Sequence, residues 1–434
     1  MSEKSVTRRR VLKGGAAAAT VGLTGHAAGR SKQANSIDYW NIHNGEDFRQ
    51  PINNIVSNFQ NNSGTTVNTR FVDNDDIESQ LSAAVASNTL PNTGLLAIQT
   101  IQRLGADGSL SKQSATSVIE NIGSDDFREG PLQFMGAPDG GYYGVPADAW
   151  VQGIWYRKSV FEENDLDPPV TWDAIRKAAE TLNDPDNNTY GIGFGTKATA
   201  YARQCFTQIA RSNGALVLDE NANVVFDEQP MIESLQFVKD LSQYVPGAVS
   251  FNDTRNLYGN QQEHMFFYSS YLLPDLLANN GKEMVQNTGL APATENKRKS
   301  TYGQVLGHSI FNGDDPQLNA SKNLVNHVMS GDSYIQWCHM QPGGTMPVLK
   351  STAEKEAYLD NDILSAWSDT INQISSALGN MERFDFVGGQ LLPEFGQITS
   401  RSLVSQAVNR VAVKGHDPDT VAKEQAQKMR NALQ

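Results

Sequence analysis

The stretch that decides the fold is VPADAWVQGIWYRKSVFEENDLDPPVTWDAIRKAAETL, residues 145–182. Its first part, residues 145–156, is apolar and predicts a long extended segment. Pro168 and Pro169 exclude a helix at that point, and Thr171 predicts the cap of a new helix. The apolar stripe of this helix would consist of Trp172, Ile175, Ala179 and Leu182. Nothing in the stretch looks like a catalytic motif, so its role is expected to be mechanical.

The length and charge of the chain limit what it can be. A chain of 434 residues favours two compact units. Its formal net charge is -13, although the first thirty residues hold six basic side chains and only one acid. The acidic remainder repels nucleic acid and anionic lipid, so no nucleic-acid partner is expected. Such a surface also suits high salt and is compatible with a haloarchaeal source.

The N-terminus predicts export. A basic segment with the sequence TRRRVLK, residues 7–13, precedes a modest run of Ala, Val, Leu and Gly. This pattern is typical of a twin-arginine signal and is too short and too Gly-rich for a membrane span. His26, and not Cys, follows Leu23-Thr24-Gly25, so lipid anchoring is not supported there. Cleavage near Ala27, retention as an anchor, and a basic stub before a buried Ala-rich helix remain open.

The two cysteines, Cys205 and Cys338, are expected to be free and buried. They lie far apart in the sequence, and a disulfide between two lobes would lock them together. No spacing of Cys or His supports a zinc or iron–sulfur site, so no metal and no cofactor are expected.

A β-α-β-α-β order begins at Ser36. Strands are expected at residues 37–40, 67–71 and 95–98. Pro51 is expected to open the first helix, with Ile52, Ile55, Val56 and Phe59 buried and Gly64 at its end. The second helix would start at residues 75–76 and bury Ile77, Leu81 and Val85. This order predicts a parallel sheet with helices on both faces, and ligands sit beyond the carboxyl ends of such strands.

Further along the chain, strands are expected at residues 190–194, 224–226, 265–268, 290–292 and 304–311. Helices are expected at residues 201–212, 232–244 and 318–329, and a second extended, Gly-marked segment at 343–348. The glycines of residues 190–195 do not match the G-x-G-x-x-G spacing of a dinucleotide loop.

Four pieces in this order resemble one known family. They are YGVPADAWVQGIWYRKSVFEENDLDPPVTWDAI, residues 190–194 with 213–215 and 225–227, residues 264–271, and GTMPV followed by Lys350-Ser351. Together they are similar to the maltose-binding-protein-like, family 1 extracellular solute-binding proteins of ABC importers, over roughly residues 36–434. Arg157 stands where the family usually has Asn, and Pro91-Asn92 replaces the usual Pro-Asp.

The resemblance implies an α/β, two-lobed periplasmic-binding-protein-like fold, in which each lobe is a mainly parallel sheet with helices on both faces. The first lobe would hold residues 36–146 and 306–345, and the second residues 150–303 and 348–434, after a signal segment at 1–35. Hinge crossings are expected near 145–152, 303–308 and 343–350. A ligand would bind between the lobes, which close over it and dock on a membrane permease.

The residues expected to bind the ligand combine aromatic faces for a sugar ring with polar groups for its hydroxyls. Tyr271 matches the ligand-stacking aromatic of the family, and Tyr268 lies just before it. Asp148 and Trp150 lie on the first crossing, on a face that alternation leaves open. The other expected residues are Trp40, Glu46, His308, Arg383 and Phe384. For these five the alternatives are a core Trp, a helix-start acid, a structural His, a solvated Arg and a packed Phe.

The expected function is therefore capture of a small, carbohydrate-like ligand outside the cell for an ABC permease, without catalysis. The absence of a Lys/Arg cluster favours a neutral sugar or oligosaccharide over a phosphate. The twin-arginine translocase would be a partner during export, and the protein would be a monomer. An exported carbohydrate-active hydrolase, or a sensor or adhesion module without a transporter, remain the alternatives. No G-x-S-x-G, H-E-x-x-H or S-x-x-K motif supports the hydrolase.

Overall fold

A computed structural model describes residues 36–74 and 76–434 of the chain. The predicted export segment with its twin-arginine motif lies outside the described residues. Among the residues that the structure describes, no helix combines the length and the apolar character that a membrane crossing requires.

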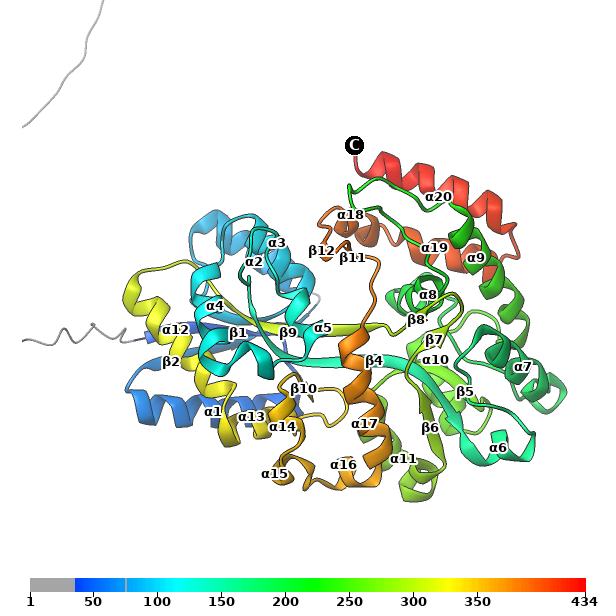
Figure 1. Ribbon diagram of the computed structural model, residues 1–434, viewed down its shortest axis with the longest axis horizontal. Coiled ribbons are helices and arrows are strands. Elements are labelled where there is room, and N and C mark those ends of the chain that lie inside the picture. Colours follow the sequence, from blue (N-terminus) through cyan, green and yellow to red (C-terminus); the bar gives the residue numbers. More distant parts are fainter. Residues whose placement is uncertain (1–35, 75) are drawn as a thin grey trace, which may run out of the picture. The chain divides into compact units, whose positions relative to one another are not determined.

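The predicted β-α-β-α-β order is confirmed. Its elements are β1 (Ser36–Asn41), α1 (Glu46–Ser63), β2 (Thr66–Phe71), α2 (Ile77–Ser87) and β3 (Thr93–Ala97). Strand β1 pairs in parallel with both β2 and β3. Right-handed crossovers to opposite neighbours of β1 place the two connecting helices on opposite faces, and Figure 1 shows α1 and α2 on opposite sides of these strands.

Two details of these helices differ from the prediction. Helix α1 begins at Glu46, and Pro51 lies inside it, because Glu46 and Asp47 favour the helix start by their charge. The predicted buried face of α1 is confirmed, and Gly64 ends the helix with φ 71°. In α2 the buried positions are Ile77, Leu81 and Ala84, whereas Val85 is 49% exposed, so its predicted burial is wrong.

The remaining helices and strands follow in chain order. Up to the end of β9 they are α3 (Ile98–Ala106), α4 (Lys112–Ile122), α5 (Glu129–Phe134), β4 (Val145–Arg157), α6 (Lys158–Glu163), α7 (Trp172–Leu182), α8 (Ala200–Ser212), α9 (Gln229–Leu241), α10 (Phe251–Gly259), β5 (Met265–Ser269), α11 (Leu272–Gln286), β6 (Thr288–Ala291), β7 (Thr294–Glu295), β8 (Lys299–Ser300) and β9 (Gly303–Ile310). After β9 they are α12 (Asp315–Val328), α13 (Gly331–Cys338), β10 (Met346–Pro347), α14 (Lys350–Ala353), α15 (Glu356–Leu359), α16 (Asp362–Ala366), α17 (Ser368–Ala377), β11 (Phe386–Val387), β12 (Gln390–Leu391), α18 (Phe395–Ser400), α19 (Leu403–Ala412) and α20 (Pro418–Ala432).

Strand β4 is the long extended segment that the sequence predicts, and two groups of strands share it. Its first half, from Val145 to Val151, pairs with β9, and β10 pairs with Asp148 and Ala149. Its second half pairs with β5 and β6. Figure 1 shows β4 running from the strands β1–β3 and β9 into the region of β5 and β6. The chain is therefore organised around one strand.

The sheet is mixed, whereas the sequence pattern predicts mainly parallel sheets. Its order is β10-β4-β9-β3-β1-β2, with β5 and β6 paired to the second half of β4. The β1 pairs are parallel, but β9 pairs antiparallel with both β3 and β4. The reason is geometric, since β4 carries the chain away from the first strands and β9 brings it back.

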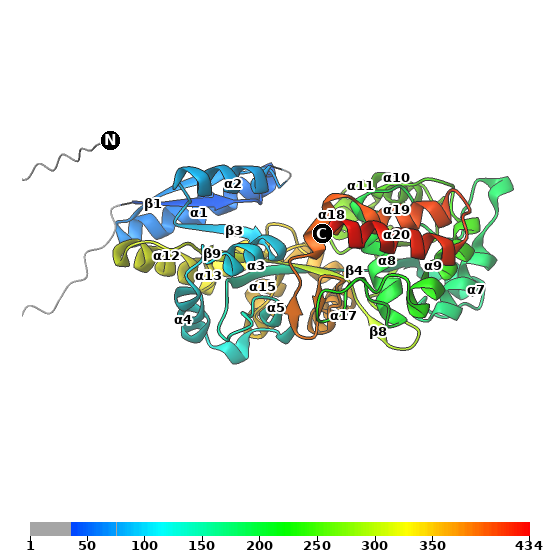
Figure 2. The ribbon, with the colours of Figure 1, turned by 90° about the horizontal axis from the view of Figure 1, so that it is seen from above.

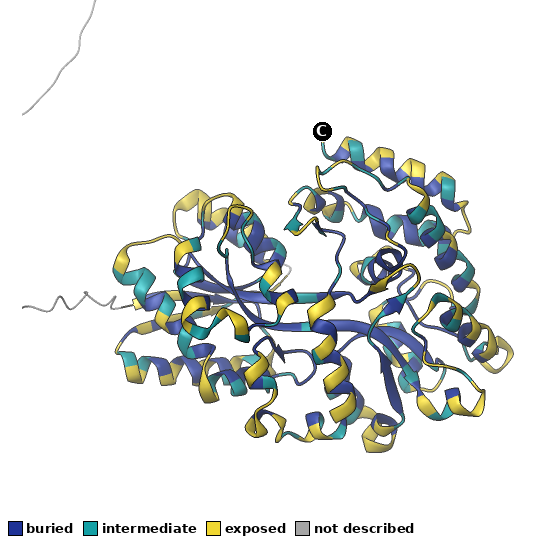
Figure 3. Ribbon diagram, in the orientation of Figure 1, coloured by how far each residue is buried: buried dark blue, intermediate teal, exposed yellow. Residues whose placement is uncertain are grey.

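Buried apolar side chains form two cores. The first surrounds β1, β3, α1, α4 and α13, and the second surrounds α7, α8, α9, α19 and α20. The helices α8, α9, α19 and α20 pack on one another, and Figure 2 shows them together. Figure 3 shows the strands buried between helices whose outer faces are exposed.

The chain moves between the two cores at several places, three of which join long segments. Within β4, Val151 lies in the first core and Ile154 in the second. The chain returns between Ala291, in the second core, and Val305, in the first. It crosses again between Met381, in the first core, and Phe384, in the second. The segment 343–350 places the side chain of Val348 in the first core. Alternate residues of β5 face different cores, so a core is not the same as a lobe, and the predicted lobe boundaries stay a prediction.

One predicted helix cap is confirmed, whereas two predicted strands are reduced to isolated bridges. Thr171 caps α7 by accepting a hydrogen bond from the backbone N–H of Ala174 at 3.1 Å, as predicted. The predicted strand at 190–194 makes only isolated bridges, from Tyr190 to Glu263 and from Gly193 to Phe266. The predicted strand at 224–226 is likewise reduced to one bridge, between Leu218 and Val224.

Both cysteines are free and buried, which confirms that prediction. Cys338 lies in the first core and Cys205 in the second. Burial raises the pKa of the Cys205 thiol to about 12, so it stays protonated and unreactive at neutral pH.

Candidate functional site

The main candidate site is a cavity of about 800 Å³ lined from both cores. This volume lies within the range of typical small-molecule sites. The residues around it come from the ends of β1 and β3, from α2 and α3, from β4 and β9, and from the segments around α8, α11 and α18. They are Ile42, His43, Asn74, Ile77, Glu78, Ala97, Gln99, Thr100, Arg103, Trp150, Ala200, Arg203, Gln204, Tyr271, Tyr302, Gln304, Leu306, Asp385, Leu391, Leu392, Pro393, Phe395, Gly396, Thr399 and Ser400.

Three aromatic rings form one wall of the cavity. Trp150 lies on β4, with the ring centre of Tyr271 at 6.2 Å and that of Tyr302 at 5.9 Å, both edge-on. Burial, with a smaller contribution from Asp148, raises the pKa of the Tyr271 hydroxyl well above its usual value. The phenol therefore stays neutral and can both donate and accept hydrogen bonds.

Glycine at position 344 permits the placement of Tyr271. A β-carbon added to Gly344 would overlap the ring of Tyr271. The ring therefore packs directly against the backbone of Gly344, which explains why glycine is required at this position of the segment 343–348. Ser270 strengthens the same contact, because its hydroxyl donates to the carbonyl of Gly343 at 2.5 Å.

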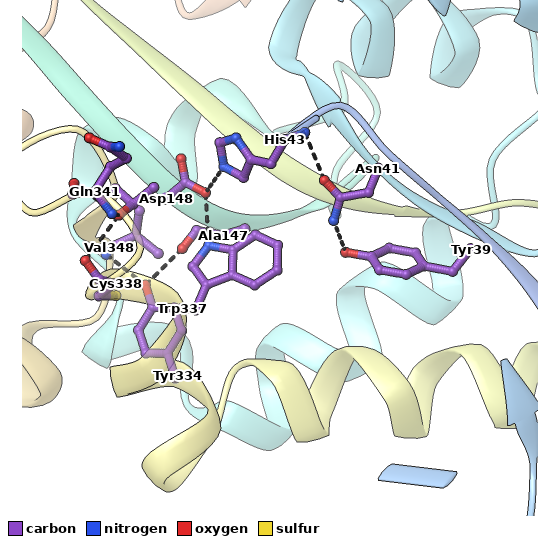
Figure 4. A network of polar contacts seen from close by, with 11 residues as sticks. Tyr39, Asn41, His43, Ala147, Asp148, Tyr334, Trp337, Cys338, Gln341 and Val348 are labelled. Atoms are coloured by element: carbon purple, nitrogen blue, oxygen red, sulfur yellow. Dashed lines mark hydrogen bonds and ion pairs between the residues drawn. The ribbon is translucent and has the colours of Figure 1, made fainter. Parts of the chain in front are cut away.

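A buried hydrogen-bond network supports His43 at the edge of the cavity (Figure 4). Asp148 is fully buried, and its Oδ2 lies 3.1 Å from Nε2 of His43 and accepts from Nε1 of Trp337 at 2.9 Å. The backbone N–H of His43 donates to Oδ1 of Asn41 at 2.8 Å, and Nδ2 of Asn41 donates to the hydroxyl of Tyr39 at 2.8 Å. An indole N–H can only donate, so the carboxylate is the acceptor and favours the Nε2–H form of His43. Nδ1 of His43 is then the acceptor left for a ligand.

A second network lies at the other end of the cavity. Arg383 is 1% exposed and holds Asp385 with two parallel bonds, Nε to Oδ1 at 2.6 Å and Nη2 to Oδ2 at 2.7 Å. Burial alone would raise the pKa of Asp385, but the Arg383 guanidinium lowers it below its usual value. Arg383 also donates to the carbonyl of Gly303 at 2.9 Å and to the side chain of Gln304. Gln304 in turn donates to Oε1 of Gln99 at 3.1 Å, which links this network to α3.

A smaller, mainly apolar hollow of about 470 Å³ lies next to the cavity. The two share Trp150, Ala200, Gln204 and Tyr271. The hollow adds the ring of Phe251, which is 37% exposed and stacks on Tyr268 with a centre distance of 4.2 Å. The combined space can hold a ligand of more than one ring.

Two of the nine predicted site residues, Trp150 and Tyr271, line the cavity. Asp148 lies behind His43, and Arg383 lies behind Asp385, so both touch the cavity through another side chain. Glu46 is exposed and lines a separate hollow of about 710 Å³ beside α1.

The other four predicted residues are buried. Trp40 is 8% exposed beneath the guanidinium of Arg70, and Tyr268 and Phe384 are 1% and 2% exposed. His308 is fully buried, and neither ring nitrogen has a partner among the described residues. Burial lowers the pKa of His308 to about 3, so the ring is neutral. Ligand contact by all nine residues stays a prediction.

Most of the polar and aromatic residues of the cavity were not among the predicted site residues, and five of them are central to its chemistry. These five are His43, Gln99, Arg203, Tyr302 and Gln304. His43 was within reach of sequence reasoning, because it follows the carboxyl end of the first strand. The others meet only in the folded chain. Among residues 36–74 and 76–434, no group of three or more His, Cys, Asp or Glu side chains is placed to hold a metal ion.

Solved structures with similar folds are two-lobed solute-binding proteins. The ABC transporter solute-binding protein of Thermotoga lettingae, bound with alpha-D-tagatose, aligns with a TM-score of 0.72 and 19% identity over 92% of this chain and 100% of that one. The corresponding protein of Agrobacterium radiobacter in complex with ribitol aligns with a TM-score of 0.73 and 18% identity over 92% and 99%. The two-lobed α/β fold class is therefore confirmed.

The sequence itself matches the same kind of protein. The chain is 27% identical over 398 residues to "Putative ABC transporter periplasmic-binding protein YcjN" of Escherichia coli, which covers 91% of this chain and 92% of the relative. Residues 54–366, more than half of the chain, match the model of one family. The chain belongs to the family of bacterial extracellular solute-binding proteins.

Proposed function

We propose that the chain captures a sugar or a polyol in the cavity of about 800 Å³. The observation that supports this most strongly is the combination of the aromatic wall, formed by Trp150, Tyr271 and Tyr302, with neutral polar side chains. These polar side chains are Asn74, Gln99, Thr100, Gln204, Gln304 and Thr399. Similar folds have been solved with tagatose and with ribitol.

The chemistry of the wall suits such ligands. The faces of sugar rings carry C–H groups that pack on aromatic rings, and their hydroxyls need partners when they leave water. Amide side chains supply both donors and acceptors, and Nδ1 of His43 supplies an acceptor. A ligand that lacks matching hydroxyls would leave these groups unpaired, which provides selectivity.

Closure would use the strands that connect the two cores. Strand β4 and the segment that leads into β9 cross between them, and Val151 of β4 pairs with Gly303 at the start of β9. We place the hinges near residues 145–152, 303–308 and 343–350. A ligand that touches both walls binds the closed form more tightly and shifts the population towards it.

Transport follows from the family and the proposed ligand. The closed, ligand-bound protein would deliver its cargo to an ABC permease, as a monomer at the outer face of the membrane. The twin-arginine motif at residues 7–13 would direct export of the folded protein. Members of this family are extracellular binding proteins.

Thermal-shift screening of the purified protein against sugars and polyols, at low and high salt, tests the proposal. One ligand or a few related ligands should raise the melting temperature, because they bind the folded state only. Chromatography of the same mixtures should show each sugar unchanged. Released products would support the exported hydrolase, and the absence of any shift would reject the proposed ligand class.

A further inference from the structure

In the folded chain, charged side chains that are far apart in the sequence meet at the cavity. The charged residues of its lining are Glu78, Arg103, Arg203 and Asp385. Arg103 is neutralised, because its Nη2 lies 2.6 Å from Oε2 of Glu78. Asp385 is neutralised by Arg383 at 2.6 Å. The sequence alone favours a neutral ligand because no Lys/Arg cluster is visible in it, and that argument does not hold for the folded chain.

Arg203 differs from the other cations of this region. Its guanidinium makes no hydrogen bond and no ion pair with any described residue. The side chain is partly buried, and its charge contributes to the lowered pKa of Asp385. Asp385 is already engaged through both oxygens by Arg383. This end of the cavity therefore carries two arginines and one carboxylate.

The position of Arg203 is also unfavourable within its own helix. It is the fourth residue of α8 (Ala200–Ser212). A cation in the first turn is repelled by the positive end of the helix dipole. Partial burial adds a further cost when the charge has no partner. A buried or partly buried charge that opposes the helix dipole and has no partner within the protein is expected at a functional position.

We infer that the ligand carries one carboxylate, which pairs with Arg203, so that its class is an acidic sugar such as a uronic acid or an oligosaccharide that contains one. This inference rests on the proposed function and narrows it. A carboxylate matches the planar fork of a guanidinium and can accept two parallel hydrogen bonds. It also brings a single negative charge, which matches the single unpaired guanidinium of Arg203, whereas a phosphate brings close to two.

The rest of the ligand fits the same site. Trp150 and Tyr271 offer ring faces, and Gln204, one residue after Arg203, offers an amide on the same wall. A sugar ring against the aromatic wall would therefore have its carboxylate directed towards the start of α8. The carboxylate would also interact favourably with the helix dipole.

Matched pairs of ligands test this inference. Disaccharides that contain glucuronic or galacturonic acid are compared by calorimetry with the disaccharides in which the carboxylate is replaced by a hydroxymethyl group. One acidic member should bind at least about tenfold more tightly than its neutral counterpart, as expected for a hydrogen-bonded pair with a charged group. This difference should shrink as salt is raised from low to high concentration.

Variants of the cation complete the test. Arg203→Met should remove the preference, so that the acidic and the neutral member of a pair bind with similar Kd values, and Arg203→Lys should retain part of the preference. Arg176→Met on α7 is the control, since the Arg176 side chain is 42% exposed and lies outside the cavity lining. The melting temperature of the ligand-free Arg203→Met protein should not fall, because the removed charge is unfavourable there.

The outcomes separate this inference from the proposed function. If neutral sugars or polyols bind as tightly as the acids, the inference is wrong and the proposed function stands. If Arg203→Met weakens the binding of acidic and neutral ligands equally, Arg203 contributes to closure of the lobes and does not pair with a charge on the ligand. This result also overturns the inference. If neither an acid nor a neutral sugar or polyol binds, the proposed function fails, and the inference fails with it.

Discussion

Asp148 on β4 offers a sharp test of how the crossing strand supports the cavity. The side chain is fully buried, and one of its oxygens serves both Nε2 of His43 and Nε1 of Trp337. Asp148→Ala leaves the Trp337 N–H buried without an acceptor, while His43 can turn towards water in the cavity. The other oxygen of Asp148 has no partner among the described residues, so its removal recovers part of the loss.

The expected loss of unfolding free energy for Asp148→Ala is about 2–3 kcal/mol, because one stranded buried donor costs about 1–3 kcal/mol and the second donor adds to it. Asp148→Asn keeps an acceptor in the same place and loses only the charge assistance, so about 1 kcal/mol is expected. Urea unfolding with an unchanged m-value measures both. Asp173→Ala is the control, because Asp173 is 96% exposed.

The two variants should also differ in binding. Asp148→Ala releases His43 from its fixed orientation and should weaken ligand binding, whereas Asp148→Asn should keep most of it. If Asp148→Ala costs no more stability than Asp148→Asn, the two hydrogen bonds do not hold this part of the molecule, and the reasoning fails.

Three further predictions concern the site and the second core. Tyr271→Ala should raise the Kd for the ligand about tenfold, because an aromatic contact is worth about 0.5–1.5 kcal/mol beyond its buried area; calorimetry showing an unchanged Kd would contradict this. Gly344→Ala should weaken binding to a similar degree by displacing the Tyr271 ring, whereas Gly379→Ala, at a position with open space, should leave the Kd unchanged. Glu263→Gln should make stability less dependent on pH. Burial raises the pKa of Glu263 well above its usual value, so the wild-type protein gains stability below about pH 4.5 and loses it as the pH rises through the raised pKa. A difference in melting temperature between wild type and Glu263→Gln that stays constant from pH 4.5 to 8 would contradict this last prediction.

Periodic and capping signals explain why much of the fold could be predicted. The 13-residue strand β4 was visible as an apolar run, and the buried stripe of α1 follows the helical repeat. Thr171 was a reliable helix start because its side chain satisfies a free N–H of the first turn. The mixed sheet was not predictable in the same way, because strand direction depends on how distant segments return to β4.

The binding site was harder to predict because it combines side chains that are distant in sequence. Asp148 and Trp150 are two residues apart on one strand and share a face, yet only Trp150 lines the cavity. Trp337 and His43 separate Asp148 from the cavity, and these two contacts cannot be predicted from the sequence around residue 148. The unpaired charge of Arg203 is likewise a property of the folded chain, since pairing cannot be read from a sequence.

The central claim is that a sugar or polyol lies in the cavity beside β4. A crystal structure of the protein with the tightest ligand from the screen tests it most directly. The ligand should contact Trp150 and Tyr271, and its hydroxyls should form hydrogen bonds with side chains from both walls, including His43 and Gln304. A ligand bound elsewhere, for example in the hollow beside Glu46, would contradict it.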